Sequence, residues 1–497
     1  MSNAIAGGVL LSDVRPPEKL RSALLIGDRW IEETSAGQLS HVNPATGKAQ
    51  CVFPVAGKIE VDGAVAAARS VFPQWSTTPP NVRRDLLLRL AELLREHTPE
   101  FAGIAGLETG QPIGQARGTL AAEWATYYAG WVDKLDGRVI PTLGNSGLDY
   151  TLSEPYGVIG VMVPFNGPLT IAAMTVFPAL AAGNCVVLKP SELTPFSCVH
   201  LAELVLEAGI PPGVLNLVTG GGVVGDALVR HPGVDKISFT GGPVTARKIM
   251  AAAAENLTPL LLELGGKSAN LLFADAELQA ASQFSATFSM LGSGQGCALP
   301  TRLFVEASVY DQVVDSVVSI VSGLKVGMPF DPTTNLGPVI SRESQERILG
   351  VVRRACDEEA GTLLFGGERL GGELAEGFFM SPAVFGDVDP ASDLSQKEIF
   401  GPVLAISRFE TEDEALAMAN STPWGLAGYV QTSNLARMQR LSQSLEAGYV
   451  SFNGFAGLTP GAPFGGIKGS GFGREGGLAG IEEFVRCKNV FIANRDS

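Results

Sequence analysis

A cysteine and a glutamate in the middle of the chain have the residue types needed for covalent acyl chemistry. Glu263 lies in the stretch LLELGGKSAN, and Cys297 lies among small residues in GSGQGC. A thiolate attacks carbonyl carbons, and small neighbours let a substrate reach the sulfur. A nearby carboxylate can take a proton from the water that attacks the covalent intermediate. Because many cysteines are buried packing residues and most glutamates are solvated, the pair indicates catalysis only alongside a cofactor site and an oxyanion donor.

The composition is typical of a globular protein with more than one core. The 497 residues are 45% hydrophobic and 18% charged, which predicts two or three domains. A net charge of −15 argues against a nucleic-acid partner, because phosphate binding needs clustered Lys and Arg. The six cysteines show no CxxC spacing, which favours a reducing compartment and a cytoplasmic location.

Two further classes of site have little support. The four histidines, at positions 41, 97, 200 and 231, show no metal-ligand spacing, so the sequence predicts no metal site and no His-based triad. No secretory signal is recognisable. The most apolar segment, 171–188, is interrupted by Pro178 and Gly183, and is expected to form a helix, a turn and a buried strand rather than a membrane span.

The elements that must position the chemistry alternate between strands and helices from Gly157 onward. The runs VIGVMV, CVVLK, VLNLV and KISFT each precede a helical stretch, which predicts βαβ units and a parallel, doubly wound sheet. A second α/β region begins near Ser268, with RLFVE followed by a helix over 310–324. Residues 61–135 have a helical pattern, 136–154 resemble a protruding hairpin, and NVFIAN near the end is a strand able to join a sheet edge.

Polar residues and glycines follow the predicted strands, where ligands of such sheets bind. Asn166 can donate its amide to an oxyanion, or can be a turn former or helix cap. Lys189 and Glu192 suit a nucleotide ribose, and Glu192 would repel a 2′-phosphate, which favours NAD over NADP; a surface ion pair is the alternative.

Glycine-rich stretches follow the next two strands. The GGGVVG stretch at 220–225 matches G-x-G-x-x-G but lacks an acidic residue at the expected distance. FTGG at 239–242 opens a helix whose amides can hold a pyrophosphate. Further on, Glu398 and Phe400 are two apart in an apparently extended run, and so are expected on the same side of a strand.

Seven ordered motifs resemble those of the aldehyde dehydrogenase superfamily, from about Leu24 to Val490: PFNGP, LKPSE, FTGG, LELGGKSAN, GQGC, EIFGPV and PFGGIKGSG. The resemblance implies an α/β fold with a doubly wound, Rossmann-type NAD domain (22–135 and 155–265) and an α/β catalytic domain (266–465). It also implies a small β oligomerisation element (136–154 and 478–497) and a homodimer or homotetramer.

The resemblance also implies roles for individual residues. Cys297 would attack an aldehyde to form a thiohemiacetal, with the oxyanion held by the Asn166 amide and the Cys297 backbone N–H. Hydride would pass to NAD, and Glu263 would activate the water that hydrolyses the thioester. Ten residues would contact the cofactor: Lys189 and Glu192 at the adenine ribose, Glu398 at the nicotinamide ribose with Phe400 nearby, and Phe165, Gly225, Thr240, Gly241, Gly242 and Leu264.

The sequence departs from the commonest family pattern around the expected substrate. Small residues at Gly167, Gly296 and Ala298 suggest room for a bulky, aromatic or long-chain aldehyde. The expected pocket comprises Gly167, Ile171, Met174, Gly296, Ala298, Leu458 and Phe464. Thr175 stands where a lysine is often found, so whether Thr175 or Glu475 joins a proton relay stays open.

Three other functions are weighed against aldehyde oxidation. A CoA-acylating relative generally lacks the glutamate base, so Glu263 argues against it. A cysteine esterase would need a histidine partner for its thiol, and none is apparent. A binding protein built on a retired enzyme fold is disfavoured because Cys297, Glu263 and Asn166 are all present.

Overall fold

The computed structural model describes the chain except residues 1–4, 7–8, 11–13, 116–117, 144–145 and 495–497. Five strands form the parallel centre of its first sheet, in the order β13-β12-β9-β10-β11. Their bounds are β9 (Val158–Val163), β10 (Cys185–Pro190), β11 (Leu215–Leu217), β12 (Lys236–Gly241) and β13 (Leu260–Leu264). Nearly every residue of these strands is buried, as expected of a parallel sheet covered on both faces.

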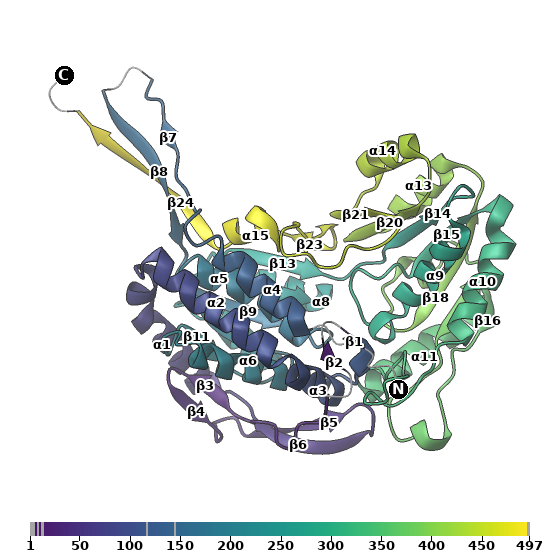
Figure 1. Cartoon of the computed structure of the whole chain (residues 1–497), viewed down its shortest axis with the longest axis horizontal. Coiled ribbons are helices and arrows are strands. Elements are labelled where there is room, and N and C mark those ends of the chain that lie inside the picture. Colours follow the sequence, from purple (N-terminus) through teal and green to yellow (C-terminus); the bar gives the residue numbers. More distant parts are fainter. Residues whose placement is uncertain (1–4, 7–8, 11–13, 116–117, 144–145, 495–497) are drawn as a thin grey trace.

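Helices cover both faces of this sheet (Figure 1). Helices α1, α7 and α8 pack on one face, and α5 and α6 pack on the other, with α2, α3 and α4 outside them. The helices are α1 (Lys58–Ser76), α2 (Pro80–Glu96), α3 (Thr98–Glu108), α4 (Gly118–Ala129), α5 (Pro168–Ala181), α6 (Phe196–Glu207), α7 (Gly222–Val229) and α8 (Pro243–Ala253). The predicted alternation of strands and helices is therefore confirmed, and the apolar segment 171–188 forms most of α5, a turn and most of β10. No helix in the described part of the chain combines the length and apolarity needed to span a membrane.

Short antiparallel strands complete the edges of this unit. β3 and β4 extend the sheet beyond β11, and β23 pairs antiparallel with β13 at the other edge. The remaining short strands form separate two-stranded pairs. Their bounds are β1 (Ile5–Ala6), β2 (Val9–Leu10), β3 (Leu24–Ile26), β4 (Arg29–Ile31), β5 (Gln38–Asn43), β6 (Lys48–Pro54), β19 (Trp424–Gly425), β22 (Ile467–Lys468) and β23 (Gly471–Phe472).

A second sheet has seven strands in the order β16-β17-β18-β15-β14-β20-β21, parallel except for the edge strand β16. The strands are β14 (Ala269–Leu272), β15 (Arg302–Glu306), β16 (Thr362–Phe365), β17 (Ala383–Gly386), β18 (Val403–Phe409), β20 (Ala427–Gln431) and β21 (Tyr449–Phe452). The helices are α9 (Leu278–Ser289), α10 (Tyr310–Ser322), α11 (Arg342–Asp357), α12 (Asp393–Gln396), α13 (Glu412–Asn420) and α14 (Leu435–Ser444). Since the chain alternates strand and helix here too, the second predicted α/β region is confirmed.

The segment around Glu398 differs from its prediction. β18 begins only at Val403, so Glu398 and Phe400 precede the strand, and their predicted placement on one side of a strand is wrong. Phe400 has a φ of 53°, in the left-handed region that bulky residues rarely adopt. The backbone leaves the extended path here because the Glu398 carboxylate accepts a hydrogen bond from the Gly266 N–H at 3.0 Å and packs against Gly265.

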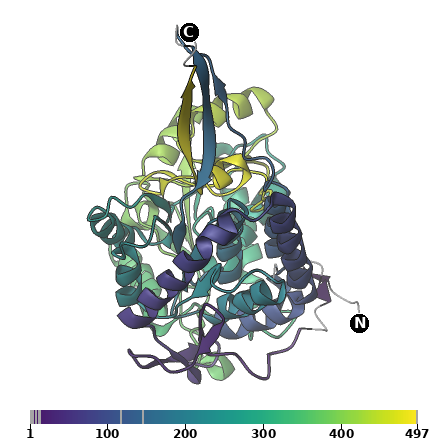
Figure 2. The same cartoon turned by 90° about the vertical axis from the view of Figure 1, so that its left-hand side faces the viewer.

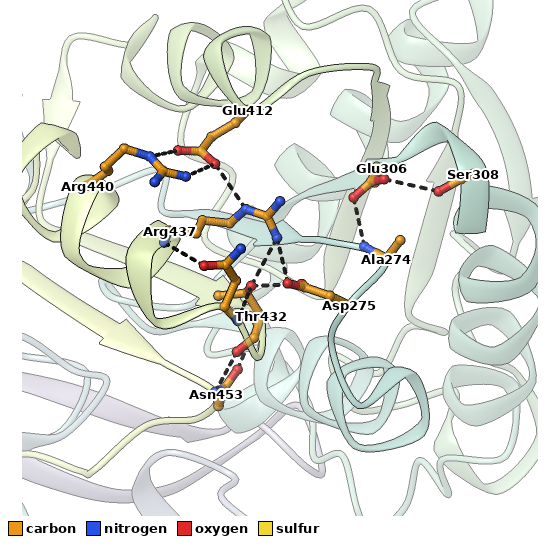
Figure 3. A network of polar contacts seen from close by, with 10 residues as sticks. Ala274, Asp275, Glu306, Ser308, Glu412, Thr432, Arg437, Arg440 and Asn453 are labelled. Atoms are coloured by element: carbon orange, nitrogen blue, oxygen red, sulfur yellow. Dashed lines mark hydrogen bonds and ion pairs between the residues drawn. The ribbon is translucent and has the colours of Figure 1, made fainter.

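A polar network fixes the helices beside β20 (Figure 3). Arg437 on α14 contacts the Asp275 carboxylate at 2.9 Å and Glu412 of α13 at 3.0 Å, and Arg440 adds a second guanidinium to Glu412. These guanidinium groups, Arg440 foremost, lower the pKa of Glu412. Thr432, at the end of β20, donates to Asp275 at 2.8 Å. The network links α13 and α14 to the carboxyl end of β20 in the second sheet.

A three-stranded antiparallel sheet projects from the body of the molecule (Figures 1 and 2). It joins β7 (Val139–Ile140) and β8 (Gly147–Pro155) to the final strand β24 (Val485–Ala493), which follows α15 (Gly477–Glu482). The predicted hairpin and the predicted sheet-joining final strand are thus both present, paired within one chain. Residues 144–145 and 495–497 of the expected oligomerisation element lie outside the described residues.

Candidate active site

The catalytic centre begins where the first sheet reverses its strand order. β10 lies on one side of β9 and β12 on the other, and ligands of doubly wound sheets bind at the carboxyl ends of strands at such a point. Asn166 follows β9, Thr240 lies near the end of β12, and Glu263 lies near the end of β13. Parallel pairing therefore places these three residues along one edge of the sheet.

Cys297 lies at the same edge of the first sheet, but it belongs to the α/β region of the second sheet, on a loop that hydrogen bonds hold on both sides. Before it, Ser293 lies in a run of three left-handed residues, and its hydroxyl donates to the Gly337 carbonyl at 2.8 Å. After it, the Tyr429 hydroxyl donates to the Ala298 carbonyl at 2.8 Å. A Cβ on Gly266 would lie 2.9 Å from the Cys297 carbonyl oxygen, so only glycine lets the end of β13 approach this closely.

Two cavities meet at this point. A groove of about 620 Å³ runs over the strand ends of the first sheet, and a pocket of about 250 Å³ opens from the opposite side. Asn166, Glu263 and Cys297 line both cavities. The structure thus brings the thiol, the amide and the carboxyl group together, although they are far apart along the chain.

The groove contains every residue expected at the cofactor, which are Phe165, Lys189, Glu192, Gly225, Thr240, Gly241, Gly242, Leu264, Glu398 and Phe400. Its chemistry fits a dinucleotide. Helices α7 and α8 open into it with Gly221 and Gly242 at their N-caps and no side-chain cap, which leaves backbone N–H groups for phosphate oxygens. The buried Thr240 hydroxyl has no hydrogen-bond partner, and a Cβ on Gly225 would already lie 3.4 Å from the Met162 sulfur.

Lys189 is buried, so the alternative of a surface ion pair does not describe it. Its ammonium donates to the Pro190 carbonyl at 2.9 Å, and burial lowers its pKa, with Glu192 partly opposing this. Sequence reasoning missed Asp226 and Lys248, which also line the groove. Asp226 directly follows the GGGVVG stretch, and this adjacency was the available signal.

A pair of buried carboxyl groups stands beside the thiol. Glu263 and Glu475 are each 3% exposed, and each has an Oε1 atom without a hydrogen-bond partner. Burial raises the pKa of Glu475 to about 8, and burial together with the Glu475 charge raises the pKa of Glu263 well above its usual value. The pair therefore keeps a proton at neutral pH. Thr175 is committed elsewhere, because its hydroxyl donates to the Ile171 carbonyl in its own helix at 3.0 Å.

The surroundings of Cys297 keep its thiol protonated at neutral pH. Burial raises its pKa well above the usual value, and the charges of Glu263, Glu398 and Glu475 raise it further. Attack on a carbonyl requires the thiolate, so the proton must leave as the reaction begins.

The pocket on the other side of Cys297 contains every residue expected around the substrate, which are Gly167, Ile171, Met174, Gly296, Ala298, Leu458 and Phe464. A Cβ on Gly167 would meet Ile171 at 3.7 Å, an ordinary van der Waals contact, so a larger side chain would fit here and the glycine leaves that volume to the pocket. The space beside Gly296 is instead filled by Leu299, which a Cβ would meet at 2.8 Å. Room in the pocket therefore comes from Gly167 rather than from Gly296.

Aromatic side chains that sequence reasoning missed form the outer wall of the pocket. Phe288 and Phe455 line it and stack with ring centroids 4.7 Å apart, and Tyr429 packs against both. Phe284 stacks on Phe288 from one helical turn earlier. This spacing of four on α9, just before the cysteine loop, was the sequence signal for an aromatic face.

Glu475 joins the site through the C-terminal segment, where its backbone N–H and carbonyl pair with those of Phe464 at 2.6 and 2.7 Å.

Comparison with known sequences gives a consistent set of relatives. The model for the aldehyde dehydrogenase family matches residues 30–490. An aldehyde dehydrogenase-like protein of Schizosaccharomyces pombe is 41% identical over 476 residues, which cover 94% of each chain. DhaS of Bacillus subtilis, also named as an aldehyde dehydrogenase, is 38% identical over 481 residues, which cover 95% of this chain and 96% of its own.

Solved structures share the whole fold. PnpE from Pseudomonas sp. WBC-3, in complex with nicotinamide adenine dinucleotide, matches with a TM-score of 0.93 and 37% identity, over 96% of this chain and 98% of its own. Betaine aldehyde dehydrogenase from Staphylococcus aureus, in complex with NAD+, matches with a TM-score of 0.94 and 33% identity, over 96% of each chain.

Proposed function

This chain belongs to the aldehyde dehydrogenase family, and we propose that it oxidises an aldehyde to the carboxylic acid with NAD+ as the hydride acceptor. The observation that carries the proposal is the meeting of Cys297, Asn166 and Glu263 at the junction of a dinucleotide-sized groove and an apolar pocket. The NAD complexes of two structural relatives support the choice of cofactor.

The reaction follows from the chemistry of these three groups. The Cys297 thiol gives its proton to water, its sulfur attacks the aldehyde carbon, and the Asn166 amide donates to the oxygen that becomes negative. NAD+ in the groove supplies a hydride acceptor. The thioester that remains on Cys297 is hydrolysed by a water whose proton is taken by the Glu263 carboxylate, so that the acid leaves and the thiol reforms. Glu475, buried beside Glu263, shares the proton of this carboxyl pair, and the proton returns to the sulfur as the thiol reforms.

The groove residues divide the cofactor between them. Lys189 and Glu192, at the end of β10, would hold the adenine ribose, and the amides at the starts of α7 and α8 would hold the pyrophosphate. Glu398 would hold the nicotinamide ribose, with Phe400 and Phe165 packed edge to face beside it at 5.7 Å. The backbone of Phe400 is left-handed, so the direction of the Phe400 ring differs from the one that a residue in a β-strand would give it.

Glu192→Ser is expected to change the cofactor preference. Loss of the carboxylate removes charge-assisted hydrogen bonds to ribose hydroxyls and a repulsion of the 2′-phosphate, so kcat/KM for NAD should fall by about 10–100-fold while that for NADP rises. Steady-state kinetics with both dinucleotides measure this. Asp226→Asn is the matched control, because Asp226 lines the same groove but pairs with Arg230. A parent enzyme that prefers NADP would contradict the role given to Glu192.

The pocket favours a substrate with an apolar body. Its walls carry Met174, Leu458 and the stacked rings of Phe288 and Phe455, and Gly167 leaves one side open. Each methylene that moves from water into such a pocket contributes about 0.8 kcal/mol. We therefore infer that bulky, aromatic or long-chain aldehydes are the substrates.

A panel of aliphatic, aromatic and terpenoid aldehydes tests both the substrate class and the reaction. We expect kcat/KM for benzaldehyde-like and long-chain aldehydes to exceed that for acetaldehyde by about tenfold or more, since several carbons leave water. Betaine aldehyde, the charged substrate named for one relative, is the comparator. The product should be the free acid whether or not CoA is present, because Glu263 activates water; a CoA thioester, or a preference for acetaldehyde, would contradict the assignment.

We further propose that the chain assembles as a homodimer or homotetramer through the projecting sheet. β24 is an edge strand of that sheet, and Phe491 and Ile492 on it are exposed. An exposed strand edge is a template for pairing with another chain.

All six cysteines carry free thiols, which suits a reducing compartment such as the cytoplasm.

A further inference from the structure

Two helices bring a histidine, a glutamate and a second histidine together outside both catalytic cavities. His97 immediately precedes α3, Glu100 lies in the first turn of that helix, and His200 lies on α6. One ligand atom from each of the three lies within 4.8 Å of the other two. The sequence showed no ligand spacing because the two histidines are about a hundred positions apart and meet only through the packing of α3 on α6.

His200 is oriented as a metal ligand is. Its Nδ1 lies 2.8 Å from Glu203 Oε2, and an ionised carboxylate only accepts, so Nδ1 carries a proton; in a neutral imidazole, Nε2 then carries the lone pair. The His200 side chain is 10% exposed, and its Nε2 atom is buried without a hydrogen-bond partner. A carboxylate that fixes one ring nitrogen while the other faces a cation is the arrangement usual around protein-bound metals.

The atoms that Nε2 faces make a cation the natural partner. Glu100 Oε2 lies 3.3 Å from His200 Nε2 and 2.8 Å from His97 Nδ1. The contact with Nε2 lacks hydrogen-bond geometry, and a lone pair facing a carboxylate oxygen is repulsive unless positive charge lies between them. Two imidazole nitrogens and one carboxylate oxygen are the ligand set of tetrahedral zinc sites that leave one position to water.

We propose that His97, Glu100 and His200 bind a divalent transition-metal ion of the zinc class, with Glu203 orienting His200. The fourth position faces solvent, because the His97 and Glu100 side chains are 31% and 46% exposed. The ion would add to an existing contact between α3 and α6. At the far end of α3, the buried Glu108 carboxylate accepts from the Phe196 N–H at 2.8 Å at the start of α6. The metal would tie the near end of α3 to the same helix and so stabilise the fold.

Zinc chloride titrated into the full-length Cys297→Ser protein tests this site without interference from the nucleophilic thiol. Calorimetry should show one site outside the catalytic centre, and zinc should raise Tm in a way that EDTA reverses. His97→Ala and Glu100→Gln, introduced singly into this background, should each weaken zinc binding by about 10–100-fold. His231→Ala is the matched control, since His231 is a partly exposed histidine that lies 3.4 Å from Asp62 elsewhere.

Zinc affinity that is equal in the parent, His97→Ala and Glu100→Gln proteins would overturn the site, as would a zinc-independent Tm. Either result would leave a metal-free cluster of His97, Glu100, His200 and Glu203 as the description of this group. A crystal soaked in zinc gives a second readout, because the anomalous difference peak should lie between His97, Glu100 and His200. These outcomes do not depend on aldehyde turnover, so they stand apart from the proposed function.

Discussion

Replacing Cys297 by serine is expected to lower NAD-dependent aldehyde oxidation by roughly 10³-fold or more while dinucleotide binding survives. A serine hydroxyl is a far weaker nucleophile than a thiolate unless a strong base activates it. Among the described residues, no histidine lines either cavity to act as such a base. Steady-state NADH production measures the loss, and a fluorescence titration of NADH measures binding.

Binding should survive because Cys297 is one of many residues that line the groove, and the amides proposed to hold the pyrophosphate lie at the starts of α7 and α8. Cys356→Ser is the matched control: Cys356 is exposed on α11, so its replacement should leave the rate unchanged. Retained turnover in Cys297→Ser would place the nucleophile on another residue. Loss of NADH binding in the same variant would show that the change disturbed the groove itself.

Much of the first unit was predictable because its signals are local. The runs around β9, β10 and β12 are short and apolar, and turn residues bound them, so their strand character depends little on the rest of the chain. Parallel pairing then places every strand end at one edge, and Asn166, Glu192 and Thr240 follow from that geometry. Cys297 was singled out by its residue type and its small neighbours, and the ordered motifs then implied its role as the nucleophile; no strand pattern of the first unit would have located it.

What could not be predicted depends on contacts between distant segments. Phe400 looked extended because its neighbours are β-favouring, but the tertiary contact of Glu398 with Gly266 turns the chain before the strand begins. Glu475 was named as a possible proton-relay residue, but it lies in a glycine-dense segment without periodicity, and only the packing of that segment on β13 sets its carboxyl beside Glu263. Spacing along the chain carries no information about such meetings.

Glu263→Gln is expected to slow steady-state turnover by about 10²–10⁴-fold while sparing the first turnover. The amide has nearly the same shape as the carboxylate but cannot take a proton from water, so the thioester on Cys297 should accumulate. Stopped-flow measurement should therefore show a burst of NADH close to one per active site, followed by a slow phase. Loss of the burst as well would mean that Glu263 acts before hydride transfer.

The pH dependence separates a general base from a merely structural carboxyl. The proposed general base, Glu263, would act only when ionised, and its pKa is raised. The hydrolytic rate of the parent enzyme should therefore rise with pH as this carboxyl loses its proton, and this rising limb of the pH–rate profile should vanish in Glu263→Gln. Glu475→Gln is the matched control. It keeps the base but removes the neighbouring charge that raises the Glu263 pKa, so the limb should remain and move to lower pH. An unmoved limb in Glu475→Gln would show that the two carboxyl groups do not share their proton during catalysis.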